Sequence, residues 1–191
     1  MRYASIRDMD ISNGQGLGVS LFVQGCYFHC KNCFNSETWD FNGGKEWTTE
    51  IKEKFLKLID RDYIERVTIL GGEPLVDQNV ESVLDLVKEI REKFPKKKIW
   101  IYTGYKWNAI LYPVVTDDFN LERDRILQIR RDILNYIDVL VDEKFEDDKK
   151  DLTLKWKGSS NQHVIDVKRS LEESKIIEIE GGQSNEKKRN N

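Results

Sequence analysis

Four short apolar runs, separated by segments with helical spacing, constrain the fold of this chain more than any other feature of its sequence. The runs are residues 19–23, 67–70, 98–102 and 137–141, and each contains β-branched side chains. Between them, apolar residues recur every three or four positions from about 49 to 59, 79 to 94 and 121 to 135. Strands that alternate with helices in this way build βαβ units, so we expect an α/β fold with a mostly parallel sheet.

The rest of the chain shows weaker patterns. The stretch up to Gly18 holds Gly14 and Gly16 and is expected to be a loop, and residues 112–120 are expected to form a surface excursion. We expect one domain over residues 1–180, because a chain of 191 residues fits a single core. The polar segment 181–191 is expected to be a disordered tail.

Composition narrows the classes of partner. Lys+Arg (31) and Asp+Glu (34) nearly cancel to a net charge of −3, so polynucleotide is not an expected partner. No apolar run approaches ~18 residues, and the start lacks a secretory leader, so neither a membrane nor export is expected. Together with an odd number of cysteines, these features favour a cytoplasmic protein.

The three cysteines of the chain, Cys26, Cys30 and Cys33, fall within eight residues. A Cx3Cx2C triplet supplies three thiolates to a cubane iron-sulfur cluster that has four irons, which leaves one iron free to bind another ligand. Two other interpretations stay open. The spacing would also place all three thiols on one face of a buried helix, and His29 or His163 could complete a Cys3His zinc site.

A second motif, Gly71-Gly72-Glu73-Pro74, follows the apolar run 67–70. Two glycines let a ligand approach the backbone closely and leave their carbonyls free to accept from an ammonium group. Such a turn is also an ordinary connection between a strand and a helix. It ends the strand next in order after the one that leads into the cysteines, so both loops are expected on the same rim of the sheet.

Together these motifs closely resemble those of radical S-adenosylmethionine (SAM) enzymes. Among the radical SAM enzymes, the chain is similar to the activating proteins of anaerobic (class III) ribonucleoside-triphosphate reductases. This similarity runs from about residue 8 to 165. Further segments carry this resemblance: Asn13-Gly14, Ser36-Glu-Thr-Trp39, Tyr102-Thr-Gly-Tyr105, Val141-Asp-Glu-Lys-Phe145 and Trp156-Lys-Gly-Ser-Ser-Asn-Gln162.

The resemblance implies a ligand set for the cluster and the cofactor. Cys26, Cys30 and Cys33 would ligate three irons of a 4Fe-4S cluster, and the amino nitrogen and carboxylate of SAM would chelate the fourth. The loop Gly71–Glu73 would hold the amino group, with Gly71, Gly72 and Glu73 all contributing.

The same resemblance carries over to the ends of the third and fourth apolar runs. Thr103, Asp142 and Lys144 match positions that line the ribose and methionine parts of the cofactor. Lys144 could pair with the methionine carboxylate, and Asp142 could accept from ribose hydroxyls. The alternative is a solvated charge pair beside Glu143.

Three features depart from the family pattern. Glu143 stands where glycine is usual, Lys157 stands where arginine is usual, and residues of about 111–130 resemble an insertion. An arginine replaced by lysine loses bidentate pairing. None of these positions is among the cysteines.

The activity that the resemblance implies is reductive cleavage of SAM at the cluster, with a 5'-deoxyadenosyl radical that generates a glycyl radical. Its target would be a glycine near the C-terminus of the reductase large subunit, and a low-potential electron donor would be needed. We assign no side chain a catalytic role, and the sequence leaves a homodimer open. A chain this short would form a partial (β/α) barrel, because a complete eight-stranded one takes ~200 residues or more.

Two other functions remain as alternatives. A radical SAM enzyme could act on a different protein or a small molecule, and it should then lack the segment 156–162. A zinc-binding interaction module would need no Gly-Gly-Glu loop.

Overall fold

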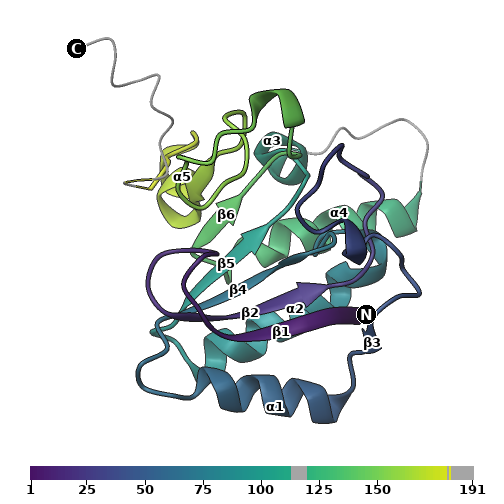
Figure 1. The fold of residues 1–191 in the computed structure, drawn as a ribbon, viewed down its shortest axis with the longest axis vertical. Helices are drawn as coiled ribbons and strands as arrows, with labels where there is room; N and C mark the ends of the chain where they lie inside the picture. Colours follow the sequence, from purple (N-terminus) through teal and green to yellow (C-terminus); the bar gives the residue numbers. More distant parts are fainter. Residues whose placement is uncertain (113–119, 180, 182–191) are drawn as a thin grey trace.

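A seven-stranded mixed sheet is the centre of the computed structural model, which describes residues 1–112, 120–179 and 181. Among these residues the strand order is β3-β1-β2-β4-β5-β6-β7 (Figure 1). The strands are β1 (Arg2–Asp10), β2 (Gly18–Val23), β3 (Lys45–Glu46), β4 (Arg66–Gly71), β5 (Lys98–Tyr102), β6 (Val139–Val141) and β7 (Val164–Asp166).

The four middle strands, β2, β4, β5 and β6, run parallel to one another, as the sequence predicts. The edge strands, which the sequence did not predict, are antiparallel: β1 and β3 lie on one side and β7 on the other. All six residues of β2 are buried, as expected for a strand inside a covered parallel sheet. The carboxyl ends of the four parallel strands therefore meet at one edge, where the motif loops begin.

Helices α1 (Thr49–Ile59), α2 (Asp77–Lys93) and α4 (Leu121–Ile133) cover one face of the sheet. The remaining helices are α3 (Trp107–Leu111), α5 (Val167–Glu173) and the short 3-10 helices η1 (Ser36–Thr38) and η2 (Asp147–Lys149). Thr48 caps α1 by accepting a hydrogen bond from the Ile51 amide at 3.3 Å. Apolar side chains of α1, α2 and α4 join alternate residues of the strands in one core cluster.

The other residues of the same strands point to the opposite face, because side chains alternate along a strand. On this second face Phe22 of β2, Leu70 of β4 and Tyr102 of β5 line a cavity. The sheet thus has one face packed on helices and one face that opens toward the motif loops, which in Figure 1 lie above the upper ends of the central strands.

The N-terminal segment was predicted to be a loop, and this prediction is wrong for residues 2–10, which form β1. The strand pairs with β2, but its register shifts between Tyr3 and Ser5 and again between Arg7 and Asp10. Such irregularities break the alternation of apolar and polar residues on which a strand prediction depends.

The glycines after β1 wrap the loop around a buried arginine. The guanidinium of Arg66 donates to the carbonyls of Asn13 at 2.8 Å and Asp10 at 2.6 Å. Gly14 has φ +138°, and a Cβ there would lie 2.5 Å from the Arg66 side chain. The loop needs glycine for both reasons, and its closure on Arg66 holds Asn13 at the wall of the cavity.

Two expectations fall largely outside the described residues: the excursion over 112–120, because residues 113–119 are not described, and the tail over 181–191, because residues 182–191 are not described. Among the helices of the described residues, none has the length and apolar character that crossing a bilayer requires.

Candidate iron-sulfur site

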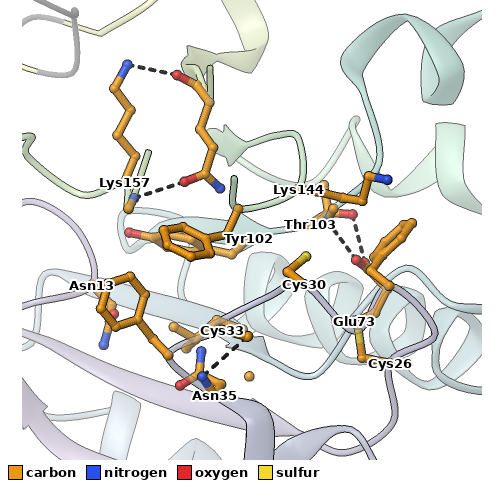
Figure 2. A pocket seen from close by; sticks show the side chains of 18 of the residues that line it. Asn13, Cys26, Cys30, Cys33, Asn35, Glu73, Tyr102, Thr103, Lys144 and Lys157 are labelled. Atoms are coloured by element: carbon orange, nitrogen blue, oxygen red, sulfur yellow. Dashed lines mark hydrogen bonds between the residues drawn. The ribbon is translucent and has the colours of Figure 1, made fainter. Parts of the chain in front are cut away.

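A cavity of about 610 Å³ lies at the carboxyl ends of the parallel strands (Figure 2). Its volume is in the range of pockets that hold small molecules and cofactors. Eight of the nine predicted site residues line it: Cys26, Cys30, Cys33, Gly71, Gly72, Glu73, Thr103 and Lys144. Residues that are far apart in the sequence thus line the same cavity. This agrees with the prediction that the motifs, which follow the strand ends, lie on one rim of the sheet.

The cysteine segment is a loop, which removes the interpretation of three thiols on one helical face. It leaves the end of β2 and turns through His29 and Asn32, whose φ angles are 45° and 55°. Cys26 is buried, whereas Cys30 and Cys33 are partly exposed. The three thiols therefore project from a turning backbone, as ligands around a shared inorganic group do.

Burial disfavours thiolates at this loop in the absence of a positive ion. It raises the pKa of Cys26 to about 11, and it also raises the pKa of Cys30. A metal centre supplies the positive charge that deprotonates such thiols. The three cysteine thiols thus suit an iron-sulfur cluster. The Asn35 amide donates a hydrogen bond to the Cys33 sulfur at 3.4 Å.

A single zinc ion would need a fourth ligand besides the three cysteines. Among the described residues, the group of three potential metal-ligating side chains whose ligand atoms lie within 4.8 Å of one another is Asp142, Glu143 and His163, which contains no cysteine. Neither His29 nor His163 lines the cavity, so neither stands ready to complete a Cys3His site.

Aromatic pairs hold the cysteine loop against the rest of the protein. The rings of Phe28 and Tyr105 meet edge to face at 5.1 Å. His29 stacks on Trp39 at 4.6 Å, which gives this histidine a packing role. Because ring pairs restrain the segments that carry them, the loop is braced at the two residues that precede Cys30.

The Gly-Gly-Glu loop is hydrogen-bonded directly to the segment that precedes Cys26. The Gly72 amide donates to the Val23 carbonyl at 2.9 Å, and the Glu73 amide donates to the Gly25 carbonyl at 2.7 Å. A Cβ on Gly72 would lie 2.5 Å from that same Gly25 oxygen, so only glycine permits the contact. Gly71 has φ +106°, which also requires glycine.

This arrangement leaves an acceptor for a ligand. In the described part of the chain, no donor is hydrogen-bonded to the Gly72 carbonyl. An unused carbonyl at the wall of a cavity suits an ammonium group, as the sequence motif predicts.

Glu73 is buried and joins the ends of β4 and β5. Its carboxylate accepts from the Thr103 hydroxyl at 2.7 Å (Figure 2). It also accepts from the Gly104 amide at 2.7 Å and the Leu75 amide at 2.8 Å. Burial raises the pKa of Glu73 to about 7, and these hydrogen bonds oppose the rise. Glu73 and Thr103, which the sequence predicts as separate cofactor contacts, are thus partners of each other.

Asn79, a residue that sequence reasoning missed, links the two motif loops a second time. It is buried at the first turn of α2, and its side-chain amide donates to the carbonyls of Gln24 at 2.9 Å and Glu73 at 3.0 Å. Both hydrogens of the amide are therefore used. The signal in the sequence was a polar residue next to the inward-facing Val80 at the start of an amphipathic helix.

Asp142 is the predicted site residue that does not line the cavity. It is buried, and its carboxylate accepts from the Trp107 amide at 2.9 Å and from the amide and ring nitrogen of His163 at 3.1 and 3.0 Å. The carboxylate raises the pKa of His163. Its predicted contact with ribose stays a prediction, while its observed contacts fasten β6 to the segments before α3 and β7.

Lys144 lies in the cavity wall and is exposed. Its ammonium stands 5.8 Å from the centre of the Phe28 ring, and it forms no ion pair with the residues that the structure describes. A cation without a carboxylate partner is available to an anionic group of a ligand. The alternative of a solvated charge pair of Asp142 and Lys144 beside Glu143 is wrong here, since Asp142 is buried and accepts hydrogen bonds from Trp107 and His163 instead.

The far end of the cavity is formed by residues to which the sequence assigned no site role: Asn13, Tyr102, Lys157 and Gln162. The Lys157 ammonium donates to the Gln162 carbonyl at 2.8 Å and lies 3.6 Å from the Glu178 carboxylate. Gln162 accepts from the Gly158 amide at 2.9 Å. These contacts fold the segment 156–162 into a closed loop, so lysine serves where arginine is usual.

Comparison with known proteins agrees with this site. Residues 12–165 match the family model for a 4Fe-4S single cluster domain. The chain is 39% identical over 166 residues to a protein of Salmonella typhimurium (strain LT2), 37% to one of Escherichia coli (strain K12) and 34% to one of Enterobacteria phage T4. These alignments cover 86% of this chain and 97%, 97% and 93% of the relatives, each named anaerobic ribonucleoside-triphosphate reductase-activating protein.

Proposed function

Because the chain belongs to the family of anaerobic ribonucleoside-triphosphate reductase-activating proteins, we propose that it activates such a reductase by generating a glycyl radical on it. The activation uses a 4Fe-4S cluster and SAM. One observation carries the proposal most directly: the cysteine loop and the Gly-Gly-Glu loop are hydrogen-bonded to each other at the wall of one cavity.

Cys26, Cys30 and Cys33 would hold the 4Fe-4S cluster, and SAM would bind at the iron that no cysteine ligates. When bound, the pair would supply one-electron reductive cleavage of SAM to methionine and a radical able to take hydrogen from carbon, with the electron coming from the low-potential donor through the cluster. No side chain of the protein takes part in that cleavage. The side chains hold and orient the reacting groups and shield them from water.

The amino group of SAM donates to the Gly72 carbonyl, the acceptor that no described donor uses. Gly71 contributes the turn that aims this carbonyl, since its φ of +106° is open only to glycine. The Lys144 ammonium pairs with the methionine carboxylate. Glu73 acts on the amino group through its backbone position and its charge, because three donors already occupy the carboxylate.

Toward the ribose, Thr103 lines the cavity next to the Glu73 carboxylate. Its hydroxyl donates to Glu73, so a lone pair is left to accept from a ribose hydroxyl. Asp142 does not line the cavity. To contact ribose, its carboxylate would have to accept from a ribose hydroxyl in addition to His163, from which it already accepts.

The apolar walls of the cavity exclude water from the proposed site. Phe22, Phe28, Leu70 and Tyr102 place apolar surface around the space between the cluster loop and the sheet. A carbon radical in such a space meets few competing hydrogen donors. We propose a partial (β/α) barrel of the radical SAM type as the fold type, and a cavity lined by one face of the sheet supports this proposal.

The target is the anaerobic reductase, and within it a glycine near the C-terminus of the large subunit. Glycine suits a radical site because its Cα radical is delocalised over two amides and no Cβ hinders its approach. A low-potential donor must reduce the cluster, and the free cysteines fit the reducing conditions of the cytoplasm.

Anaerobic reconstitution tests this function. The protein should bind iron and sulfide, release 5'-deoxyadenosine on reduction with SAM, and produce a doublet EPR signal on the reductase. Cys30→Ser should abolish all three results. Uptake of zinc without a chromophore would support an interaction module instead, and SAM cleavage without the reductase doublet would show that the radical serves a different substrate.

A further inference from the structure

The rim of the cavity carries two apolar side chains that stand in solvent. Phe34 is 56% exposed and Leu152 is 80% exposed. Among the residues that the structure describes, they are the two exposed large apolar side chains that also line the cavity. Single exposed apolar residues are common, but a pair from distant segments at one opening needs a reason.

Phe34 is held in place while it remains exposed. It follows the last cysteine of the loop, and its ring meets the ring of Phe145 at 5.2 Å. The Lys150 ammonium lies 5.0 Å from the ring centre, and a Cβ on Gly158 would come within 3.0 Å of the ring. A ring fixed on one side and open on the other can bind a partner with little loss of conformational freedom.

Leu152 is presented by a closed turn. Lys150 and Ser159 form an antiparallel bridge at the base, and the Asp151 amide donates to the Gly158 carbonyl at 3.3 Å. At the tip the Asp151 carboxylate accepts from the amide and hydroxyl of Thr153 at 2.8 and 2.6 Å. The turn thus fixes Leu152 at the opening, although the side chain belongs to neither core cluster.

The size of the cavity limits which part of a partner protein can enter at this rim. A space of about 610 Å³ holds a cofactor and a short stretch of chain, but not a folded domain. The proposed function requires a backbone carbon of another protein to reach the cluster end of this space. Only a short segment of that protein can therefore enter, and the residues on either side of it must cross the opening.

Resting on the proposed function, we infer that Phe34 and Leu152 form the docking rim on which the reductase segment lies as its glycine enters the cavity. The segment crosses the opening in an extended form and places apolar side chains on Phe34 and Leu152. The two residues serve recognition of the protein substrate and take no part in holding the cluster. The docking rim is therefore a determinant of reductase affinity, separate from cleavage of SAM.

The experiment measures reductase affinity in reconstituted protein. Leu152→Asp should raise the KM for the reductase about tenfold, as truncation of a central interface residue does, with the change in KM rather than in kcat. Phe34→Ala should act in the same direction. Two matched surface variants at residues that do not line the cavity, Leu121→Asp (70% exposed) and Tyr63→Ala (51% exposed), should retain the wild-type KM.

Direct binding gives a second readout that does not depend on turnover. Reductase immobilised on a surface should capture the cluster-free Leu152→Asp variant about tenfold more weakly than the wild type or the Leu121→Asp control. Wild-type KM and binding in both rim variants would overturn the inference, as would an equal loss in the Leu121→Asp control. Failure of the wild type to form any glycyl radical while it cleaves SAM would instead overturn the proposed function.

Discussion

The link that Asn79 makes between the two motif loops yields a quantitative prediction. Replacement by alanine removes two hydrogen bonds and leaves the Gln24 carbonyl without a donor in a buried setting, while the Glu73 carbonyl keeps the Val76 amide at 3.3 Å. The two lost bonds cost about 1 kcal/mol each and the unpaired Gln24 carbonyl costs about 1–2 kcal/mol, offset by about 0.5 kcal/mol because alanine favours a helix. The free energy of unfolding should therefore fall by about 3 kcal/mol.

Two measurements on the cluster-free protein follow from that value. For a chain of this size, 1 kcal/mol shifts the melting temperature by about 2–4 °C, so Asn79→Ala should melt about 9 °C lower. Amide hydrogen exchange should quicken about a hundredfold at Gly72 and Glu73, whose amides donate to Val23 and Gly25 across the link. In reconstituted protein the dissociation constant for SAM should rise, because the acceptor at Gly72 is no longer held in place.

The matched control is Asp85→Ala, an exposed position on the same helix. It should change the free energy of unfolding by less than about 0.5 kcal/mol and leave exchange at the two amides unchanged. The reasoning is refuted if Asn79→Ala leaves exchange at Gly72 and Glu73 at the wild-type rate. It is also refuted if the free energy of unfolding falls by less than about 1 kcal/mol, since the two hydrogen bonds would then contribute little to stability.

Three further predictions concern the walls around the site. Gly14→Ala should lower the free energy of unfolding by about 2 kcal/mol or more in denaturant titrations, because its φ of +138° and the Arg66 side chain 2.5 Å away both oppose a Cβ; a neutral effect would contradict the account of this loop. The raised pKa of His163 beside Asp142 means that protonation favours the folded state, so stability should fall as pH rises from 6.5 through the folded-state pKa. His163→Gln should lack that fall, and an unchanged profile would show that another group causes it. Lys144→Met should weaken SAM binding about tenfold in equilibrium binding to reconstituted protein, and wild-type affinity would remove Lys144 from the cofactor site.

The middle of the sheet could be predicted from the sequence because its signals are local. The runs 67–70 and 98–102 lie within β4 and β5 as observed, and the helix expected at 49–59 matches α1. Parallel order followed from the alternation of strands with helices. Strand β1 could not be found in this way, because pairing with β2 holds it in place despite two register shifts.

At the site, the sequence located most lining residues but not the contacts between them. Cys26 to Cys33 and Gly71 to Glu73 were placed by motif and strand end, and all of the predicted residues in them line the cavity. That Glu73 would accept from Thr103, and that Asn79 would bridge two carbonyls, depends on how β4, β5 and α2 pack. Tertiary distances of this kind leave no mark in spacing or composition.

The central claim is that three cysteines leave one iron open and that SAM binds there through its amino group beside Gly72. The most direct test is electron-nuclear double resonance on the reduced cluster with SAM that carries ¹⁵N at the amino position. The account predicts a ¹⁵N hyperfine coupling at the cluster, lost when the cofactor is omitted or Cys30 is changed to serine. A cluster with four irons that binds SAM and shows no such coupling would contradict the account.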